Sequence, residues 1–464
     1  MMNNLTHVIA AVSTPPGKGG VAVIRMSGHG AFEIADKVFF PISGRVFSEC
    51  KPRTQVYGYI IEDGEKIDDV LATRFPAPHS YTGEDTVEIG CHGGILVTRT
   101  VLEALLRAGA VPATAGEFTR RAFINGRLSL TEAEAISDLL EARSREQMRL
   151  SGDSARSRLS ERIFSIRTEL VGLMSSVYAR IDYPDEDLGD FTDDELLARI
   201  YNIKESCESL LSTYRTGRAI SEGVRTVICG KPNAGKSTLY NLLSGEDAAI
   251  VTDIPGTTRD VLERSLPLGR VMLNIADTAG IRENKNMDAV ERIGIKKSRQ
   301  MIDKSELLFA IFDTSRDFDE EDELIIEAVM SSSSPKIALL NKSDLTPHFG
   351  EERLSGFDYV FKISALSDGE ECLTALANAV NSLFTDEKIV IGQDAVISSA
   401  RQHAALTRCI DYLSAAEESL RLGFAQDAAS SDIERALGAI SELDGRAVSE
   451  EIVSDIFSKF CVGK

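Results

Sequence analysis

Residues 230–237 read Gly230-Lys-Pro-Asn-Ala-Gly-Lys-Ser237, which fits the pattern G-x-x-x-x-G-K-[ST] of a phosphate-binding loop. A strand-like apolar run over 226–229 precedes the loop, and a helix-forming run over 238–243 follows it, as the motif requires. Glycines let backbone N–H groups face phosphate oxygens, Lys236 offers these oxygens a positive charge, and Ser237 can ligate Mg²⁺. The loop therefore predicts a nucleoside triphosphatase built on an α/β sheet.

Three downstream motifs, each after a strand-like run, restrict the nucleotide to GTP. Asp277-Thr278-Ala279-Gly280 supplies an aspartate that would hold Mg²⁺ through water and a glycine that would sense the γ-phosphate. In Asn341-Lys342-Ser343-Asp344, the last carboxylate can accept hydrogen bonds from N1 and N2 of guanine, two donors that adenine lacks. Ser364-Ala365-Leu366 would lie at guanine O6. The four motifs together predict a GTP hydrolase.

Two positions indicate how hydrolysis differs from that of Ras-type enzymes. Ile281 stands where those enzymes carry a glutamine that orients the attacking water, and isoleucine cannot hydrogen-bond water. Another side chain must therefore take that role. The amide of Asn233 could ligate a monovalent cation beside the phosphates or simply stabilise the turn, and the residues themselves leave both open. Thr258 is expected to complete the Mg²⁺ shell when γ-phosphate is bound.

The rest of the chain divides into segments of different texture. Residues 1–122 alternate short apolar runs with turns, which predicts strands over 8–12, 21–26, 55–61, 70–75 and 86–90 and a helix over 96–106. Apolar residues at steps of three and four after about 129 and after 395 predict helices. Between them, strands are expected over 225–229, 271–276, 307–312, 336–340 and 359–363.

The simplest architecture is a multidomain α+β and α/β protein. An N-terminal α+β domain spans 1–122, and a helical domain in two halves, 123–217 and 386–464, flanks an inserted, Ras-like, doubly wound α/β domain over 218–385. One long helix is expected from the apolar series between Leu159 and Ile181. Thr192 with Glu195 forms a capping-box pattern for the next helix.

Composition excludes several classes of function. The 464 residues carry a net charge of −21, which argues against broad, non-specific binding of nucleic acid. Seven cysteines without a C-x-x-C pair predict reduced thiols, and six scattered histidines argue against a zinc site. No apolar run approaches the ~20 residues of a membrane span and no signal-peptide pattern is present, so a cytoplasmic protein without membrane association is expected.

Two arginine clusters interrupt the acidic sequence. We interpret both as solvated helix faces neutralised by nearby glutamates rather than as nucleic-acid contacts. They consist of Arg120, Arg121 and Arg127, and of Arg143, Arg145, Arg149, Arg156, Arg158 and Arg162.

Several separate stretches point to one family. They are Thr14-Pro-Pro-Gly-Lys-Gly-Gly-Val-Ala-Val-Ile-Arg-Met-Ser-Gly28, Tyr81-Thr-Gly-Glu-Asp85, Cys91-His-Gly-Gly94, Gly116-Glu-Phe-Thr-Arg-Arg-Ala-Phe-Ile-Asn-Gly-Arg127, Ala133-Glu-Ala-Ile136, Ala248-Ala-Ile-Val-Thr-Asp-Ile-Pro-Gly-Thr-Thr-Arg-Asp260, Val290-Glu-Arg-Ile-Gly294 and Phe460-Cys-Val-Gly-Lys464. Through them the chain resembles the MnmE (TrmE) family of tRNA modification GTPases along essentially its whole length.

The resemblance implies a folate-binding, dimerising N-terminal domain, a helical domain and a GTPase domain whose cycle is driven by GTP hydrolysis. It implies a homodimer that works with the flavoprotein MnmG, in a heterotetramer or larger complex, on C5 of the wobble uridine of certain tRNAs. The product would be 5-carboxymethylaminomethyluridine or an aminomethyl relative. A tetrahydrofolate derivative (5-formyl or 5,10-methylene) would donate the one-carbon unit, FAD would enter only through the partner, and potassium would activate hydrolysis.

The resemblance also assigns residues. It places K⁺ ligands at Asn233, Thr252, Ile254 and Thr257, and folate contacts at Arg25, Glu88, Arg127 and Lys464. The Mg²⁺ ligands expected from the motifs themselves are Ser237 and Thr258. Two residues are expected to be catalytic: Lys236, and Glu291, which would orient the attacking water. The spacing from Asp277 to Glu291 is two residues longer than in the family. The expected GTP contacts are Asn233, Ala234, Gly235, Lys236, Ser237, Thr238, Thr252, Asp253, Ile254, Pro255, Gly256, Thr257, Thr258, Asp277, Thr278, Ala279, Gly280, Asn341, Lys342, Asp344, Ser364, Ala365 and Leu366.

Three questions stay open at this point. Cys461 fits a possible catalytic thiol near the folate pocket or a buried structural thiol, while Cys-Val-Gly-Lys fits a prenylation box poorly.

A ribosome-assembly or regulatory GTPase is one alternative function. A folate-dependent transferase with a vestigial GTPase domain is another. The N-terminal 122 residues argue against the first, and the intact phosphate loop argues against the second.

Overall fold

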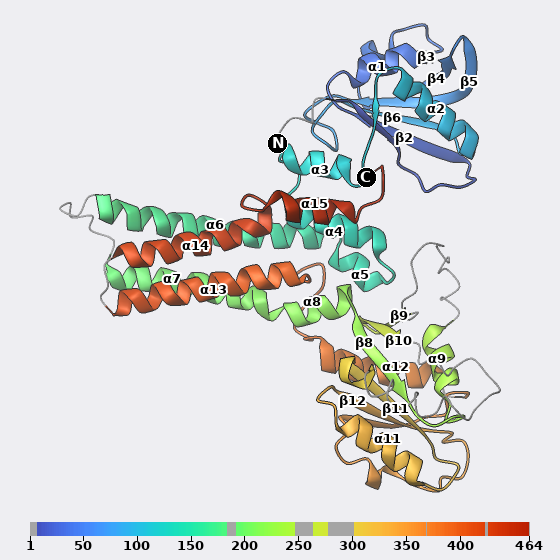
Figure 1. The fold of residues 1–464 in the computed structure, drawn as a ribbon, viewed down its shortest axis with the longest axis vertical. Coiled ribbons are helices and arrows are strands. Elements are labelled where there is room, and N and C mark those ends of the chain that lie inside the picture. The colour runs from blue at the N-terminus through green and yellow to red at the C-terminus, as the bar shows by residue number, and fades with distance from the viewer. Residues whose placement is uncertain are drawn as a thin grey trace. The chain divides into compact units, whose positions relative to one another are not determined.

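The computed structural model describes residues 7–182, 192–245, 263–276, 301–367, 369–422 and 426–463. The chain forms two compact units (Figure 1). The first combines Met1–Leu140, Ile163–Asp182 and Gln426–Lys464, and the second combines Glu141–Arg162 and Tyr183–Ala425.

The first unit contains a seven-stranded sheet with strand order β3-β4-β5-β6-β2-β1-β7. All its strand pairs are antiparallel except the β1–β7 pair, which is parallel. The strands are β1 Ile9–Val12, β2 Val21–Ser27, β3 Phe39–Pro41, β4 Val56–Glu62, β5 Glu65–Phe75, β6 Thr86–His92 and β7 Val111–Pro112. The five predicted strands of this region are confirmed. The short β3 and β7 were not predicted, because two or three residues carry no periodicity.

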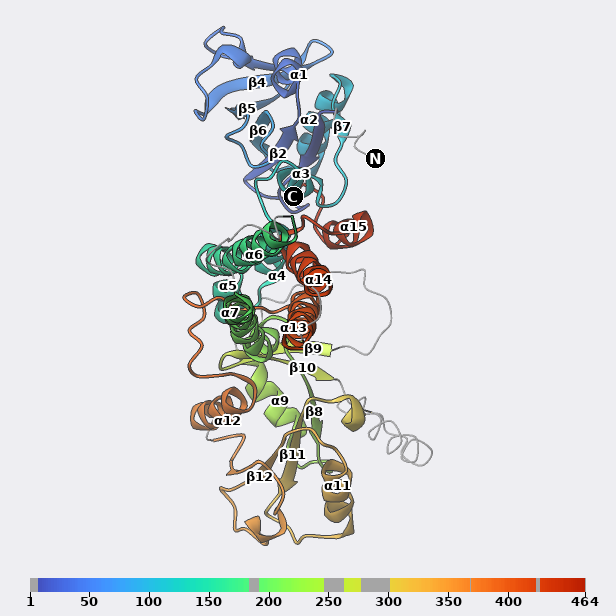
Figure 2. The ribbon, with the colours of Figure 1, turned by 90° about the vertical axis from the view of Figure 1, so that its left-hand side faces the viewer.

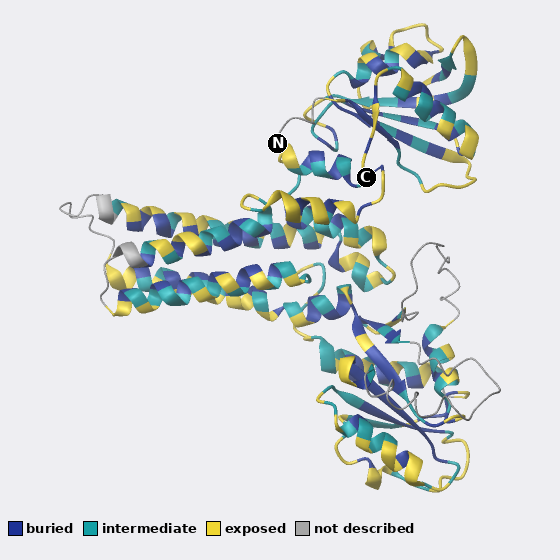
Figure 3. Ribbon diagram, viewed as in Figure 1, coloured by how far each residue is buried: buried dark blue, intermediate teal, exposed yellow. Residues whose placement is uncertain are grey.

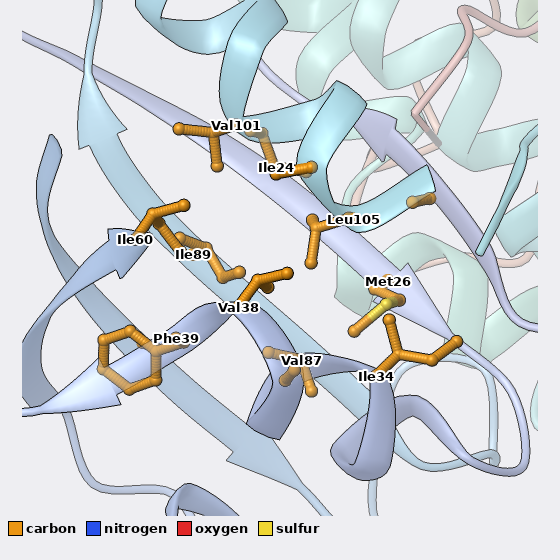
Figure 4. Packing of buried hydrophobic residues seen from close by; sticks show 14 of the residues in the cluster. Ile24, Met26, Ile34, Val38, Phe39, Ile60, Val87, Ile89, Val101 and Leu105 are labelled. Atoms are coloured by element: carbon orange, nitrogen blue, oxygen red, sulfur yellow. The ribbon is translucent and has the colours of Figure 1, made fainter. Parts of the chain in front are cut away.

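One face of this sheet is covered by α1 (Ala31–Val38) and α2 (Ile95–Arg107). Figure 4 shows Val101 and Leu105 of α2 packed near Ile24 of β2. Successive residues of a strand point to opposite faces, so Arg25 lies on the other face. That second face carries a smaller cluster formed by Ile9, Ala11, Ala113 and Phe118.

The helical part of the first unit packs on segments from both ends of the chain. Helix α4 (Leu130–Glu141) shares a core with α15 (Glu450–Ser458), and α3 (Glu117–Ile124) contacts α15. Thr131 donates from Oγ1 to the carbonyl oxygen of Leu443 at the end of α14 (Gln426–Asp444) at 2.6 Å. The predicted long helix is α6 (Asp153–Asp182), which contributes residues 163–182 to this unit.

The second unit contains a six-stranded sheet with strand order β13-β12-β11-β8-β10-β9. Five strands are parallel, and β9 is an antiparallel edge strand. The strands are β8 Val224–Cys229, β9 Glu263–Leu268, β10 Val271–Ala276, β11 Leu307–Asp313, β12 Lys336–Asn341 and β13 Tyr359–Lys362. The five strands predicted here are confirmed, and β9 is an addition.

Helices cover both faces of this second sheet. Helices α9 (Lys236–Ser244) and α12 (Gly369–Phe384) belong to one apolar cluster, and α11 (Glu320–Met330) belongs to another. Figure 2 shows α12 and α11 on opposite sides of the strands. Every residue of β11 is buried, as the dark central strands of Figure 3 illustrate. A parallel sheet enclosed on both faces is the predicted doubly wound, Ras-like α/β fold.

The second unit also contains α5 (Arg145–Leu150), α7 (Asp193–Ser212), α8 (Tyr214–Ser221) and α13 (Ala400–Arg421). Helices α7 and α13 pack along each other, and Nζ of Lys204 lies 3.0 Å from Oε2 of Glu417 between them. The predicted capping box of α7, between Thr192 and Glu195, is present. Helix α8 leads directly into β8 and thus into the phosphate loop. No helix in the described part of the chain has the length and apolar character needed to cross a membrane.

Candidate functional site

The phosphate loop joins β8 to α9 in the second unit. Its backbone has positive φ at Gly230 (155°), Asn233 (63°) and Gly235 (109°). A Cβ at Gly230 would lie 2.5 Å from the carbonyl oxygen of Ile311, and one at Gly235 would lie 2.1 Å from Nδ2 of Asn341. Glycine is therefore required at both positions for the loop to pack against β11 and β12, in addition to any contact with phosphate.

Lys236, at the start of α9, is held over the loop by backbone oxygens. Its Nζ donates to the carbonyl oxygens of Gly230 and Lys231, both at 2.6 Å. An ammonium group has three donors, so one N–H remains for a phosphate oxygen. Burial lowers the pKa of Lys236 and raises the pKa of the neighbouring Cys229 thiol to about 12. At neutral pH this thiol is therefore uncharged and does not repel an anion.

Asn341 joins the phosphate loop to both guanine-side loops. Its buried side chain donates from Nδ2 to the carbonyl oxygen of Ala234 at 2.8 Å, and its Oδ1 accepts from the backbone N–H of Ala365 at 3.1 Å. The sequence predicted Asn341 only as a member of the guanine motif. In the structure its amide is already used within the protein, so its contribution is to hold three loops together.

Lys342 is fixed by an ion pair with the end of β11. Its backbone has a φ of 66°, and its Nζ lies 2.6 Å from Oδ2 of Asp313. Burial favours the neutral form of Asp313, but hydrogen bonds from Lys342 and Ser315 outweigh it and lower the pKa of this carboxyl. Sequence reasoning missed Asp313, because nothing near it in the chain indicates its partner.

Four predicted contacts with GTP or its cations are accessible. Asn233 and Ser237 are exposed on the phosphate side, while Asp344 and Leu366 are exposed on the guanine side. They all follow the carboxyl ends of parallel strands, where open α/β sheets bind ligands. Ser364 and Ala365 are buried beneath this surface. The structure thus brings the phosphate and guanine motifs to one edge of the sheet.

Several predicted site residues lie outside the described residues. They are Thr252, Asp253, Ile254, Pro255, Gly256, Thr257, Thr258, Asp277, Thr278, Ala279, Gly280, Glu291 and Lys464. Strand β10 ends at Ala276, directly before Asp277, as predicted.

In the first unit, Arg25 and Glu88 face each other across β2 and β6. Nε and Nη2 of Arg25 both lie 2.9 Å from Oε1 of Glu88. The guanidinium also lies over the rings of Tyr81 (5.2 Å) and Phe118 (5.7 Å). A carboxylate ligand would therefore share Arg25 with Glu88. Sequence reasoning predicted the two charged residues but not the aromatic pair, although Tyr81 and Phe118 stand in the stretches that carry the family resemblance.

The Tyr81–Asp85 stretch brings Arg127 towards the same region. The carbonyl oxygen of Thr82 accepts from Nδ2 of Asn125 at 2.8 Å. A Cβ at Gly83 would lie 3.2 Å from Cγ of Arg127, so the stem of this exposed arginine passes beside Gly83, two residues after Tyr81. The loop thus contacts Arg25 through Tyr81 and lies beside Arg127 at Gly83.

The C-terminal segment runs beside β1, the neighbour of the strand that carries Arg25. The Oγ of Ser13 donates to the carbonyl oxygen of Gly463 at 3.0 Å, and Val462 forms an antiparallel bridge with Ala115. Cys461 is exposed. The alternative of a buried structural thiol is therefore wrong, because the chain here adds to the edge of the fold and leaves this side chain outside.

The first arginine cluster needs a correction at Arg121. This side chain is only 1 % exposed, so it does not belong to a solvated face. Its Nη1 lies 3.1 Å from Glu84 and its Nη2 lies 3.0 Å from Glu117, so two carboxylates neutralise the buried charge. Neutralisation by glutamate was predicted, but burial was not, because Glu84 comes from a distant loop.

A parallel sheet whose strands end in a phosphate loop and an Asn-Lys-x-Asp motif defines a GTP hydrolase of the Ras-like class. Residues 8–127 match the family described as "GTP-binding protein TrmE N-terminus", and residues 130–461 match "MnmE helical domain". The chain belongs to the MnmE family of tRNA modification GTPases.

Relatives from this family are similar to the chain along nearly its whole length. The tRNA modification GTPase MnmE of Thermotoga sp. (strain RQ2) is 41 % identical over 98 % of this chain and 99 % of its own length. That of Carboxydothermus hydrogenoformans is 38 % identical over 99 % of this chain and 100 % of its own length. Era of Aquifex aeolicus is similar over 41 % of this chain and 66 % of its own, with 22 % identity and a TM-score of 0.27. The predicted family, fold class and enzyme class are confirmed.

Proposed function

We propose that this chain is a potassium-activated GTPase that acts with an MnmG-type flavoprotein on C5 of the wobble uridine of certain tRNAs. The product is 5-carboxymethylaminomethyluridine or an aminomethyl relative. A tetrahydrofolate derivative, in 5-formyl or 5,10-methylene form, supplies the one-carbon unit, and FAD enters only through the flavoprotein. The observation that carries the proposal is the similarity, over 98 % of the chain, to relatives described as tRNA modification GTPases.

The proposed division of labour follows the domains. Residues 1–122 bind folate and form a homodimer, residues 218–385 bind GTP, and the helical halves 123–217 and 386–464 connect them. The direct continuation of α8 into β8 supports this division, because a movement of the GTPase domain reaches α8 through one covalent segment. The protein acts in the cytoplasm.

In the proposed GTPase site, the chain positions the phosphates and their cations. Lys236 contributes the donor that its two carbonyl contacts leave free, and Ser237, exposed at the start of α9, ligates Mg²⁺ with Thr258. When bound there, Mg²⁺ would neutralise charge on the phosphate oxygens. Glu291 orients the attacking water in place of the glutamine that Ile281 replaces, and the backbone N–H groups of Gly280 and the phosphate loop contact the γ- and β-phosphates.

Potassium activation is expected to depend on the amide of Asn233, with Thr252, Ile254 and Thr257 as further ligands. Removing the amide should reduce the rate in K⁺ to the rate in Na⁺, because the cation that neutralises phosphate charge loses a ligand. The φ of 63° at this position makes alanine an imperfect test, since it costs roughly 1–2 kcal/mol of backbone strain. We therefore expect the same loss in Asn233→Gly, which tolerates this backbone, as in Asn233→Ala.

The measurement is GTP hydrolysis in KCl and NaCl at equal ionic strength. Thr238→Ala, in the first turn of α9, is not a suitable control because Thr238 is itself an expected GTP contact. Asn381→Ala, at the end of α12 far along the chain, removes an amide outside the proposed site and should keep the K⁺ response. A K⁺ response that survives in both Asn233 variants would remove this residue from the cation site.

Folate binding is expected to weaken about tenfold or more in Arg25→Gln, because a charge-assisted hydrogen bond contributes roughly 1.5–3 kcal/mol. Glutamine keeps part of the stem but loses the guanidinium that pairs with Glu88 and lies over the rings of Tyr81 and Phe118. Calorimetric titration with 5-formyltetrahydrofolate measures the change. Arg99→Gln breaks an exposed ion pair with Glu103 in α2 of the same unit and should leave binding unchanged. Equal affinities of wild type and Arg25→Gln would exclude Arg25 from the folate site.

Mass spectrometry of tRNA nucleosides tests the proposed function itself. Cells that lack this protein should lose the modified wobble uridine, and the wild-type gene should restore it. A ribosome-assembly or regulatory GTPase predicts an unchanged nucleoside profile. A folate transferase with a vestigial GTPase domain predicts that a variant without GTP hydrolysis restores the modification as well as the wild type does.

A further inference from the structure

Lys231, the second residue of the phosphate loop, is buried although the nucleotide motif gives it no function. Its side chain is 2 % exposed, and lysine is rarely buried without a partner. Its Nζ lies 2.7 Å from Oδ2 of Asp322 and also donates to Oδ1 of Asp319. Both carboxylates come from the start of α11, about ninety positions away in the chain.

The two carboxylates are themselves fixed by the helix. Asp319 is the N-cap of α11, and its Oδ1 accepts from the backbone N–H of Glu321 at 2.9 Å and of Asp322 at 3.3 Å. In return, Oδ2 of Asp322 accepts from the backbone N–H of Asp319 at 3.2 Å. Lys231 thus binds oxygens that a capping box already holds in place. Its side chain ends on a rigid part of the domain.

The charge of Lys231 is retained despite its burial. Burial acts to lower the pKa of this ammonium, but the two aspartates outweigh it, and the pKa is raised above its usual value. Breaking a buried pair by removing one partner leaves an uncompensated charge, which is strongly unfavourable. The contact between the loop and α11 therefore persists at neutral pH.

The backbone of Lys231 connects this anchor to the catalytic lysine. Its carbonyl oxygen accepts from Nζ of Lys236 at 2.6 Å and from the backbone N–H of Ala234 at 3.3 Å. A side chain fixed at α11 restricts where this carbonyl can lie. The carbonyl in turn restricts the direction of the one N–H of Lys236 that remains for phosphate.

We propose that Lys231 is a positioning residue for GTP hydrolysis, which acts by anchoring the phosphate loop to α11 and so aiming Lys236 at the phosphates. The proposal rests on residues 230–237 being the phosphate loop of the GTP site. A positioning residue and a residue that only stabilises the fold predict different kinetics. Misplacing a catalytic group by about 1 Å can lower the rate about a hundredfold, while affinity for the base is unaffected.

The test compares Lys231→Met, Lys231→Arg and Asp322→Asn in the full chain. Lys231→Met keeps the stem and removes the charge; it should lower turnover about ten- to hundredfold and weaken GDP binding about tenfold. Its preference for GTP over ATP should stay at the wild-type value, because Asp344 is unaltered. Lys231→Arg keeps the charge and should recover most of the turnover. Asp322→Asn keeps the shape of the capping box and should lower turnover about threefold or more.

Lys459→Met is the matched control, since it removes the same group from an exposed pair with Asp455 in α15. Its turnover should equal that of the wild type. Folding of each variant is followed by its thermal melting curve. Wild-type turnover and GDP affinity in a folded Lys231→Met protein overturn the proposal. If that variant does not fold, wild-type kinetics in Asp322→Asn overturn it instead. A wild-type chain that does not bind GDP would contradict the GTP site itself, which is a separate failure.

Discussion

Replacing Lys236 by methionine is expected to slow GTP hydrolysis by about two to three orders of magnitude, because a donor aimed at developing charge contributes about 2.7–4 kcal/mol. Methionine keeps most of the stem and removes the ammonium. The loop carbonyls of Gly230 and Lys231 lose their donor as well, so the variant should also bind GTP more weakly. Single-turnover phosphate release at saturating GTP separates the chemical step from this loss of affinity.

A second lysine provides the comparison for this result. Nζ of Lys37 also donates to a backbone carbonyl, that of Ala108, at 3.0 Å, but it lies on the surface of the first unit. Lys37→Met should therefore hydrolyse GTP at the wild-type rate. If Lys236→Met retained a rate within threefold of the wild type, the phosphate loop would not be the site of hydrolysis.

Asp344→Asn is expected to exchange the base preference from guanine to xanthine. In the proposed site the carboxylate of Asp344 would accept from two guanine donors, whereas the amide of asparagine offers one acceptor and one donor. Xanthine presents a carbonyl in place of the amino group at C2, which suits that donor. Each hydrogen bond to a charged group contributes roughly 1.5–3 kcal/mol, so GTP affinity should fall by about two to three orders of magnitude.

Competition of GTP and XTP for the protein measures this exchange, since it compares the two bases in one sample. Asp317→Asn makes the same substitution at another exposed aspartate of the domain, which lies 3.0 Å from His348. It should keep the wild-type preference for GTP. An Asp344→Asn protein that still prefers GTP over XTP would place guanine recognition elsewhere.

The parallel strands could be predicted from the sequence because each is a continuous apolar run. Strand β11 is buried along its whole length, so its seven residues carry no polar interruption except the final Asp313. Strand β9 escaped prediction because Glu-Arg-Ser-Leu-Pro-Leu lacks such a run. Its Pro267 is tolerated because β9 lies at the edge of the sheet, where one side of the strand needs no donor.

The nucleotide motifs could be predicted because each is a short, contiguous piece of chain. Their supports could not, because the partners lie far apart in the sequence. Lys231 meets Asp322 across 91 positions, and Lys342 meets Asp313 across 29. Arg121 shows the same limit in the first unit, since its charge is balanced by Glu84 from another loop. Only the fold reveals that these charges are paired.

The amide of Asn341 couples the ordering of two loops of the nucleotide site. Because one side chain bonds both the phosphate loop and the loop at Ala365, ordering either loop lowers the entropic cost of ordering the other. We therefore expect the two ends of GTP to bind with positive cooperativity, although they would touch different loops. A guanosine fragment and a phosphate fragment would each gain affinity from the presence of the other, and by the same factor, since such coupling is reciprocal.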